Sequence, residues 1–155
     1  MQRLQRSPRT IPEDDRDGTL AAVALLGDPA PGTADTFRFF NLPGPVLNGA
    51  GAVAFTVVLG PPGGEMPDPG ERSGVFVFDP EAALLEKILA AGDRLEVAPG
   101  DVREVAEVLL RGPSGNQDGR GSGFNDRGQA ALRVVFAGGS QAIVRATPAD
   151  AVLDD

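Results

Sequence analysis

The loop from Asn116 to Asp126 carries the densest group of side chains in this sequence that could bind a metal. Its oxygen-bearing residues, set among glycines, are Asn116, Asp118, Asn125 and Asp126. Carboxylate and amide oxygens are the ligands that calcium takes in proteins. The spacing departs from the EF-hand pattern, because Arg120 occupies a ligand position and no glutamate follows at the twelfth. We therefore predict no metal and no cofactor, with calcium as the alternative. Asp118 and Arg120 would equally form a solvated ion pair.

Two other acidic residues, Asp28 and Asp93, could act as paired carboxylates in acid–base catalysis. An enzyme that processes glycans would use carboxylates such as Asp93 and Asp118. Each directly follows a glycine, which is typical of an aspartate that forms a turn. The sequence contains no histidine and no cysteine, which excludes a Ser-His-Asp triad, a thiolate nucleophile and zinc held by either residue type. It also contains no tryptophan and no tyrosine, the aromatic platforms on which sugar faces usually stack. We predict no catalytic residue and no enzymatic activity.

Charge and hydropathy exclude further classes of partner. A net charge of −8 opposes binding to nucleic acid, because neutralising phosphates needs a basic surface. No apolar stretch approaches the ~20 residues of a membrane-spanning helix, so we expect no membrane insertion. Acidic residues between 13 and 17 interrupt what would otherwise resemble a secretory signal, so no signal peptide is predicted. The compartment cannot be inferred from these features.

Two segments occur twice, in the same order. Asn48–Phe55 returns as Asn125–Leu132, with asparagine, glycine, alanine and a large apolar residue in register. Leu20–Asp28 likewise matches Leu85–Asp93 in its apolar pattern and its final Gly-Asp. Such self-similarity indicates a copied supersecondary unit whose copies cover one another's apolar faces.

The units are expected to be all-β, with antiparallel strands joined by glycine- and proline-rich turns. Strands are predicted at Phe37–Phe40, Ala52–Leu59, Ser73–Phe78, Val102–Leu110, Ala130–Phe136 and Gln141–Ala146. Glu81–Ala91 has the composition of a helix, and Arg103–Leu110 invites the same assignment. We assign strand to both, because the segment equivalent to the first, Leu20–Leu26, shows no amphipathic helical pattern and equivalent segments should share a conformation.

The segment Asn-x-x-Gly-x-x-Ala-Phe, a following hairpin and a closing Gly-Asp-x-x-Pro-Gly resemble a bacterial tandem-repeat family named for its NxxGxxAF motif. Members often end in varied surface-anchoring signals, so the resemblance implies a secreted or cell-surface location. It covers roughly 20–147, and the chain is similar to the C-terminal portion of a longer array. Leu132 departs from the motif, where the family has phenylalanine.

Four short strands per unit resemble the blade of a β-propeller, and about two units make an incomplete ring. We expect a tail at 1–18 that is disordered, a leading strand at 19–27, unit one at about 28–93, unit two at about 94–147 and an acidic tail at 148–155. Two blades leave exposed sheet edges, which implies association with other copies or further repeats.

A structural role in the repeat is predicted for ten residues: Gly27, Asp28, Asn48, Gly51, Phe55, Gly92, Asp93, Asn125, Gly128 and Leu132. The asparagines are expected to bond their own backbone, the glycines to adopt conformations closed to other residues, and Phe55 to lie in the core. We expect a non-catalytic structural or interaction module of unknown ligand. A carbohydrate-binding or glycan-processing propeller-like domain is the alternative.

Overall fold

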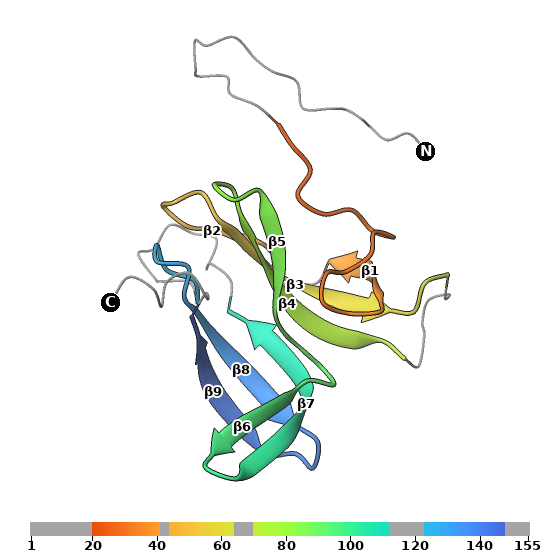
Figure 1. Cartoon of the computed structure of the whole chain (residues 1–155), viewed down its shortest axis with the longest axis vertical. Coiled ribbons are helices and arrows are strands. Elements are labelled where there is room, and N and C mark those ends of the chain that lie inside the picture. Colours follow the sequence, from red (N-terminus) through yellow and green to blue (C-terminus); the bar gives the residue numbers. More distant parts are fainter. Residues whose placement is uncertain (1–19, 41–43, 64–69, 112–122, 148–155) are drawn as a thin grey trace.

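The computed structural model describes residues 20–40, 44–63, 70–111 and 123–147, and every regular element in them is a strand (Figure 1). Sheet one contains β1 (Thr36–Phe40), β2 (Val46–Leu47), β3 (Val53–Gly60), β4 (Arg72–Asp79) and β5 (Leu84–Ala90). Sheet two contains β6 (Arg94–Ala98), β7 (Asp101–Leu110), β8 (Ala130–Phe136) and β9 (Gln141–Ala146). No helix in the described residues could cross a membrane.

Both sheets are antiparallel throughout, as predicted. Sheet one has the strand order β1-β3-β4-β5, with the short β2 also paired to β3, and sheet two has the order β6-β7-β8-β9. The two sheets pack against each other, which gives the incomplete propeller-like arrangement expected from about two units. The sheets also follow one another along the chain, so each is built from one contiguous stretch.

The segment with helical composition forms a strand, as the repeat predicted. β5 pairs with β4 from Asp79 opposite Leu84 to Gly74 opposite Ala90. Leu84–Ala90 therefore obtains its hydrogen bonds from a neighbouring strand, and this pairing outweighs a helix propensity of a few tenths of a kcal/mol per residue. β7 is also a strand over its whole length, paired with β6 from Asp101 to Glu104 and with β8 from Val105 to Leu110.

The central strand β3 is buried on both faces because its side chains alternate between two apolar clusters. Ala54 belongs to the inter-sheet core, which holds Val46, Val75 and Leu89 of sheet one against Val105, Val108, Leu132, Val134 and Phe136 of sheet two. Phe55 belongs to what we call the outer cluster, on the opposite face: Ala30, Phe37, Phe55, Val57, Leu59, Phe76 and Ala90. Phe55 is buried, which confirms its predicted place in the core, and its counterpart Leu132 is buried as well.

Aromatic rings dominate the outer cluster. Phe37 meets Phe76 edge to face with ring centroids 5.2 Å apart, and Phe55 stacks on Phe76 at 6.0 Å. Phe40 extends the group, edge to face with Phe55 at 5.7 Å. Such ring pairs stabilise a core beyond their buried area, so this face of sheet one has a packed centre of its own.

The leading strand predicted at 19–27 is not present in the described residues. Residues 20–27 have no strand conformation, although Val23 and Ala24 pack against the outer cluster. Leu20, Leu25 and Leu26 are exposed. A strand needs a neighbour to satisfy its backbone N–H and C=O groups, and in the described residues this segment bonds to a strand only at its end, where the N–H of Gly27 donates to the Phe37 carbonyl of β1.

Candidate functional site

The repeated asparagine turns are the most distinctive polar feature of the structure. In the first, the Asn48 side-chain oxygen accepts hydrogen bonds from the backbone N–H groups of Ala50 at 3.0 Å and Ala52 at 2.8 Å. The N–H of Gly51 donates to the Asn48 carbonyl at 3.1 Å. Gly51 has φ +88°, a conformation that favours glycine, as predicted.

The second turn repeats these bonds. The Asn125 side-chain oxygen accepts from the N–H groups of Arg127 at 3.0 Å and Gln129 at 2.9 Å. Gly128 has φ +79° and donates its N–H to the Asn125 carbonyl at 3.0 Å. The expectation that each asparagine bonds its own backbone is therefore met in both copies.

The two turns also contact each other, which the sequence did not reveal. The Asn48 Nδ2 donates to the Asn125 carbonyl at 2.8 Å, and the N–H of Gly49 donates to Asp126 Oδ1 at 2.6 Å. A Cβ on Gly49 would lie 2.9 Å from both carboxylate oxygens of Asp126, so a larger residue would displace this exposed carboxylate. Asn48 is only 9% exposed. Equivalent residues of the two copies therefore join the two sheets at one end.

These contacts bear on the calcium candidate. Asn125 uses its side-chain oxygen for its own turn, and Asp126 gives one oxygen to Gly49. Asn116 and Asp118 lie outside the described residues. Within the described part of the chain, no group of three or more acidic residues is placed to hold a metal ion. A calcium site stays a sequence-based hypothesis.

The two Gly-Asp landmarks also form equivalent turns. The N–H of Gly27 donates to the Phe37 carbonyl at 2.7 Å, and the N–H of Phe37 donates to the Asp28 carbonyl at 3.0 Å. In the second copy, Gly92 donates to the Val105 carbonyl and Val105 donates to the Asp93 carbonyl, both at 2.8 Å. Both glycines have positive φ, +92° and +97°.

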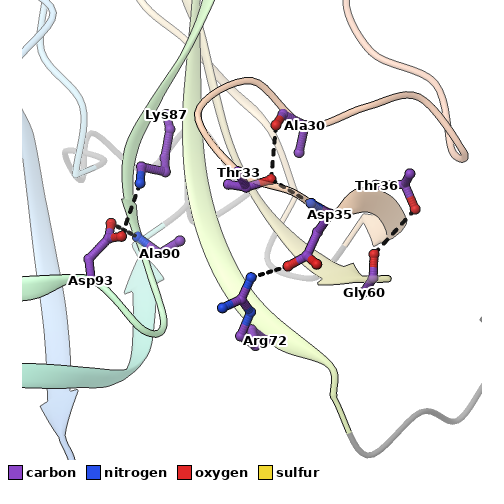
Figure 2. A network of polar contacts seen from close by, with 9 residues as sticks. All are labelled: Ala30, Thr33, Asp35, Thr36, Gly60, Arg72, Lys87, Ala90 and Asp93. Atoms are coloured by element: carbon purple, nitrogen blue, oxygen red, sulfur yellow. Dashed lines mark hydrogen bonds and ion pairs between the residues drawn. The ribbon is translucent and has the colours of Figure 1, made fainter. Parts of the chain in front are cut away.

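The Asp93 carboxylate holds its turn rather than facing an open site. One oxygen accepts from Lys87 Nζ at 3.0 Å, and the other accepts from the backbone N–H of Ala90 at 2.9 Å (Figure 2). Figure 2 also shows Asp35 ion-paired with Arg72. These carboxylates are placed to fix backbone and neighbouring side chains.

A third ion pair, Asp101 with Arg103 at 2.7 Å, lies on the exposed β6–β7 hairpin. The hydrogen bond from Arg103 holds the pKa of Asp101 below its ordinary value, and the same bond raises the pKa of Arg103. Arg103 also donates to the Ser140 hydroxyl at 3.0 Å and lies 5.8 Å from the ring centre of Phe136. Because the pair is solvent-exposed, it orients the hairpin and contributes little to stability.

Two hydroxyl groups in sheet one accept hydrogen bonds across the sheet interface. Ser73 Oγ accepts from the N–H of Val108 at 2.9 Å, and Thr56 Oγ1 accepts from the N–H of Leu110 at 3.4 Å. β7 bends at a register shift before these positions, so its backbone N–H groups reach sheet one. Sequence reasoning missed both hydroxyl residues, since only the packing of the sheets shows their partners.

The outward face of sheet two differs from the corresponding face of sheet one. The strand registers place Thr56 in correspondence with Arg133 and Val77 with Arg145. In sheet one these positions face the second sheet, whereas in sheet two the arginines are exposed and Arg133 donates to Gln141 at 3.2 Å. A polar outer face is typical of the terminal unit of a repeat stack. Aligning the two copies position by position would have revealed this difference.

Comparison with known proteins adds one finding. No curated protein matches the chain, and no solved structure matches it. A family model matches residues 5–146, a range that includes every strand of the described residues. The chain belongs to the family described as "Family of unknown function (DUF7453)".

Proposed function

We propose that the protein is a non-catalytic structural or interaction module, in which two packed β units form a rigid scaffold and exposed loops and sheet edges make the contacts. The resemblance to the NxxGxxAF repeat proteins supports a place at a bacterial cell surface or outside the cell.

The single observation that carries this proposal is the use made of the repeated polar residues. Asn48, Asn125 and Asp126 form hydrogen bonds within the turns and across the junction between the two sheets. The two carboxylate oxygens of Asp93 accept hydrogen bonds from Lys87 Nζ and from the backbone N–H of Ala90 in its own turn. The two asparagines, which occur in both copies, thus act on the backbone of the scaffold, and Asp126, which corresponds to Gly49, bonds the backbone of the other copy; both uses support a packing role.

The proposal is tested on the full chain with a glycan-binding panel and a glycoside-hydrolysis screen, applied to the wild type and to two matched variants, Asp93→Asn and Asp28→Asn. Both residues follow a glycine at equivalent positions, and the structure shows carboxylate bonds to Lys87 Nζ and the Ala90 N–H for Asp93. We expect no saturable glycan binding and no hydrolysis in any of the three proteins.

The same variants separate a structural from a catalytic role. Asp93→Asn should lower the melting temperature, because it weakens the ion pair with Lys87 and one backbone bond, worth about 1 kcal/mol together. Asp28→Asn should change it less. Hydrolysis or glycan binding that disappears in either variant while the melting temperature is unchanged would refute the proposal and favour the glycan alternative.

A further inference from the structure

Residues 20–26 correspond in sequence and position to strand β5, but they are not hydrogen-bonded into a sheet. Their sequence corresponds to β5, and both segments lead into the same Gly-Asp turn. Val23 and Ala24 pack against the outer cluster. Their equivalents in β5, Ile88 and Leu89, pack in the same way against the inter-sheet core. The segment therefore packs on the outer face of sheet one in the way that β5 packs on the inner face of sheet two.

Sheet two, in turn, lacks the strand that this segment matches. β8 and β9 correspond to β3 and β4, since Phe55 pairs with Phe76 in the first copy and Leu132 pairs with Val144 in the second. In sheet one, β5 covers the other edge of β4. Beside β9, no described strand takes that place. One end of the chain thus offers a β5-like segment, and the other offers an edge that lacks one.

The two features lie on opposite sides of the molecule. In Figure 1 the orange segment before β1 is at the upper right, β9 is at the lower left, and sheet one lies between them. A single chain cannot bring the two together without dismantling the packing of its sheets. We propose that residues 20–26 of one copy of this chain pair, head to tail, with the edge of β9 in a second copy, an edge that no described strand covers. The proposal rests on the proposed function as an interaction module and names its partner.

The register of β4 and β5 predicts the register of this pairing. Transferred to β9, it places Ala21 opposite Arg145 and Leu20 opposite Ala146. Leu20 is 78% exposed in the single chain, and Ala146 is half-buried at the rim of the inter-sheet core. Leu20 would therefore cover apolar surface at that rim. Residues 18–27 carry no charge, so no like charge approaches Arg145.

Pairing at the edge leaves the outward face of sheet two in water. Arg133 and Arg145 stand there where sheet one has Thr56 and Val77, and stacking a second copy on that face would remove two cations from solvent. The contact is therefore limited to strand addition, in which backbone hydrogen bonds supply the affinity. Because donor and acceptor are different surfaces, the assembly grows as a chain or closes as a ring.

The first experiment measures mass against concentration for the full chain by sedimentation velocity and light scattering. The wild type should form a concentration-dependent series of species larger than the monomer. Ala22→Pro should remain monomeric, because proline removes a backbone donor and disfavours pairing. The matched control Ala22→Val should associate at least as well as the wild type. Ala22 is exposed, so neither substitution disturbs the core, and the melting temperatures verify this.

The second experiment fixes the register through cysteine cross-linking, since the chain contains no native cysteine. Ala21→Cys and Arg145→Cys are made on separate, mass-tagged chains and mixed under oxidising conditions. Directly opposed residues in an antiparallel pair have Cα atoms roughly 4.5–5.5 Å apart, within the range of a disulfide. Gln141→Cys, four residues further along β9 and therefore about 13 Å away, is the matched control.

We expect the mixed Ala21→Cys and Arg145→Cys disulfide to exceed the statistical share and to form at least ten times faster than with Gln141→Cys. Dominant homodimers of Ala21→Cys would indicate two-fold pairing of the 20–26 segments and would overturn the proposal, as would equal rates for the two β9 positions or a monomer at all concentrations. Those results would leave the proposed function standing, since it fails only through catalysis or glycan binding.

Discussion

Replacing Asn48 with alanine tests whether the contact between the two asparagine turns holds the sheets together. The substitution removes the bonds from Ala50 and Ala52 within the turn and the bond to the Asn125 carbonyl across the sheets. The matched variant Asn125→Ala also removes two turn bonds, but its Nδ2 donates to Gln129 in the same exposed turn. The two variants differ mainly in the bond that crosses between sheets and in burial.

The expected losses in the free energy of unfolding differ because Asn48 is buried and Asn125 is exposed to solvent. A net hydrogen bond is worth about 1 kcal/mol, and water replaces much of it at an exposed site. We expect Asn48→Ala to lower the free energy of unfolding by about 2–3 kcal/mol and Asn125→Ala by about 1 kcal/mol. The first value stays moderate because the Asn125 carbonyl still accepts from Gly128. For a chain of this size, the melting temperatures should fall by roughly 4–12 °C and 2–4 °C.

The assay is urea denaturation followed by circular dichroism, with thermal melting as a second readout. Equal losses in Asn48→Ala and Asn125→Ala would refute the reasoning, because the contact across the sheets would then contribute nothing. A double-mutant cycle of Asn48→Ala with Asp126→Ala provides a further check, and neighbouring bonds in one junction should give a coupling energy of at least about 0.5 kcal/mol.

Asn48→Asp tests the direction of the same bond. It keeps the oxygen that serves the turn and replaces the donor with an oxygen that faces the Asn125 carbonyl. Burial and the facing Asn125 carbonyl disfavour the charged form, and we expect them to outweigh the N–H bonds kept from Ala50 and Ala52, so that the pKa of the introduced carboxyl lies above its unfolded value. A raised folded-state pKa means that the variant is relatively more stable below the unfolded value of about 4 and loses stability as the pH rises. A pH-independent deficit would contradict this assignment.

Three further predictions concern single contacts. Gly49→Ala should cost about 1 kcal/mol, because its Cβ would displace the exposed Asp126 carboxylate and weaken the bond that the Gly49 N–H donates to it, and the double variant with Asp126→Ala should lose less than the sum of the two in urea denaturation. Ser73→Ala should cost about 1–2 kcal/mol by leaving the buried N–H of Val108 without its acceptor, and an unchanged urea midpoint would contradict the bond. Asp101 has a lowered pKa, so its contribution is present above about pH 4 and lost as the pH falls; the difference in urea midpoint between Asp101→Asn and the wild type should narrow in acid.

Much of the local structure could be predicted from the sequence because it depends on bonds within a few residues. The Asn-x-x-Gly turns form through side-chain bonds from residues two and four positions ahead, and their glycines have the positive φ that such turns need. The strands predicted at 130–136 and 141–146 agree residue for residue with β8 and β9. β5 is a strand, as predicted against its helical composition, but the premise of that prediction fails, because the equivalent residues 20–26 do not share its conformation.

Only the tertiary structure shows which strands and turns lie next to one another. Residues 20–26 share the apolar pattern of β5, yet they are not a strand, because β5 pairs with β4 and no described strand pairs with residues 20–26. The bond from Asn48 to Asn125 likewise depends on two sheets packing in one register. The turns depend on hydrogen bonds between residues that are close in the sequence, so the sequence predicts them. Strand pairing and inter-sheet bonds need a distant partner, which only the folded chain, or a second copy of it, brings within reach.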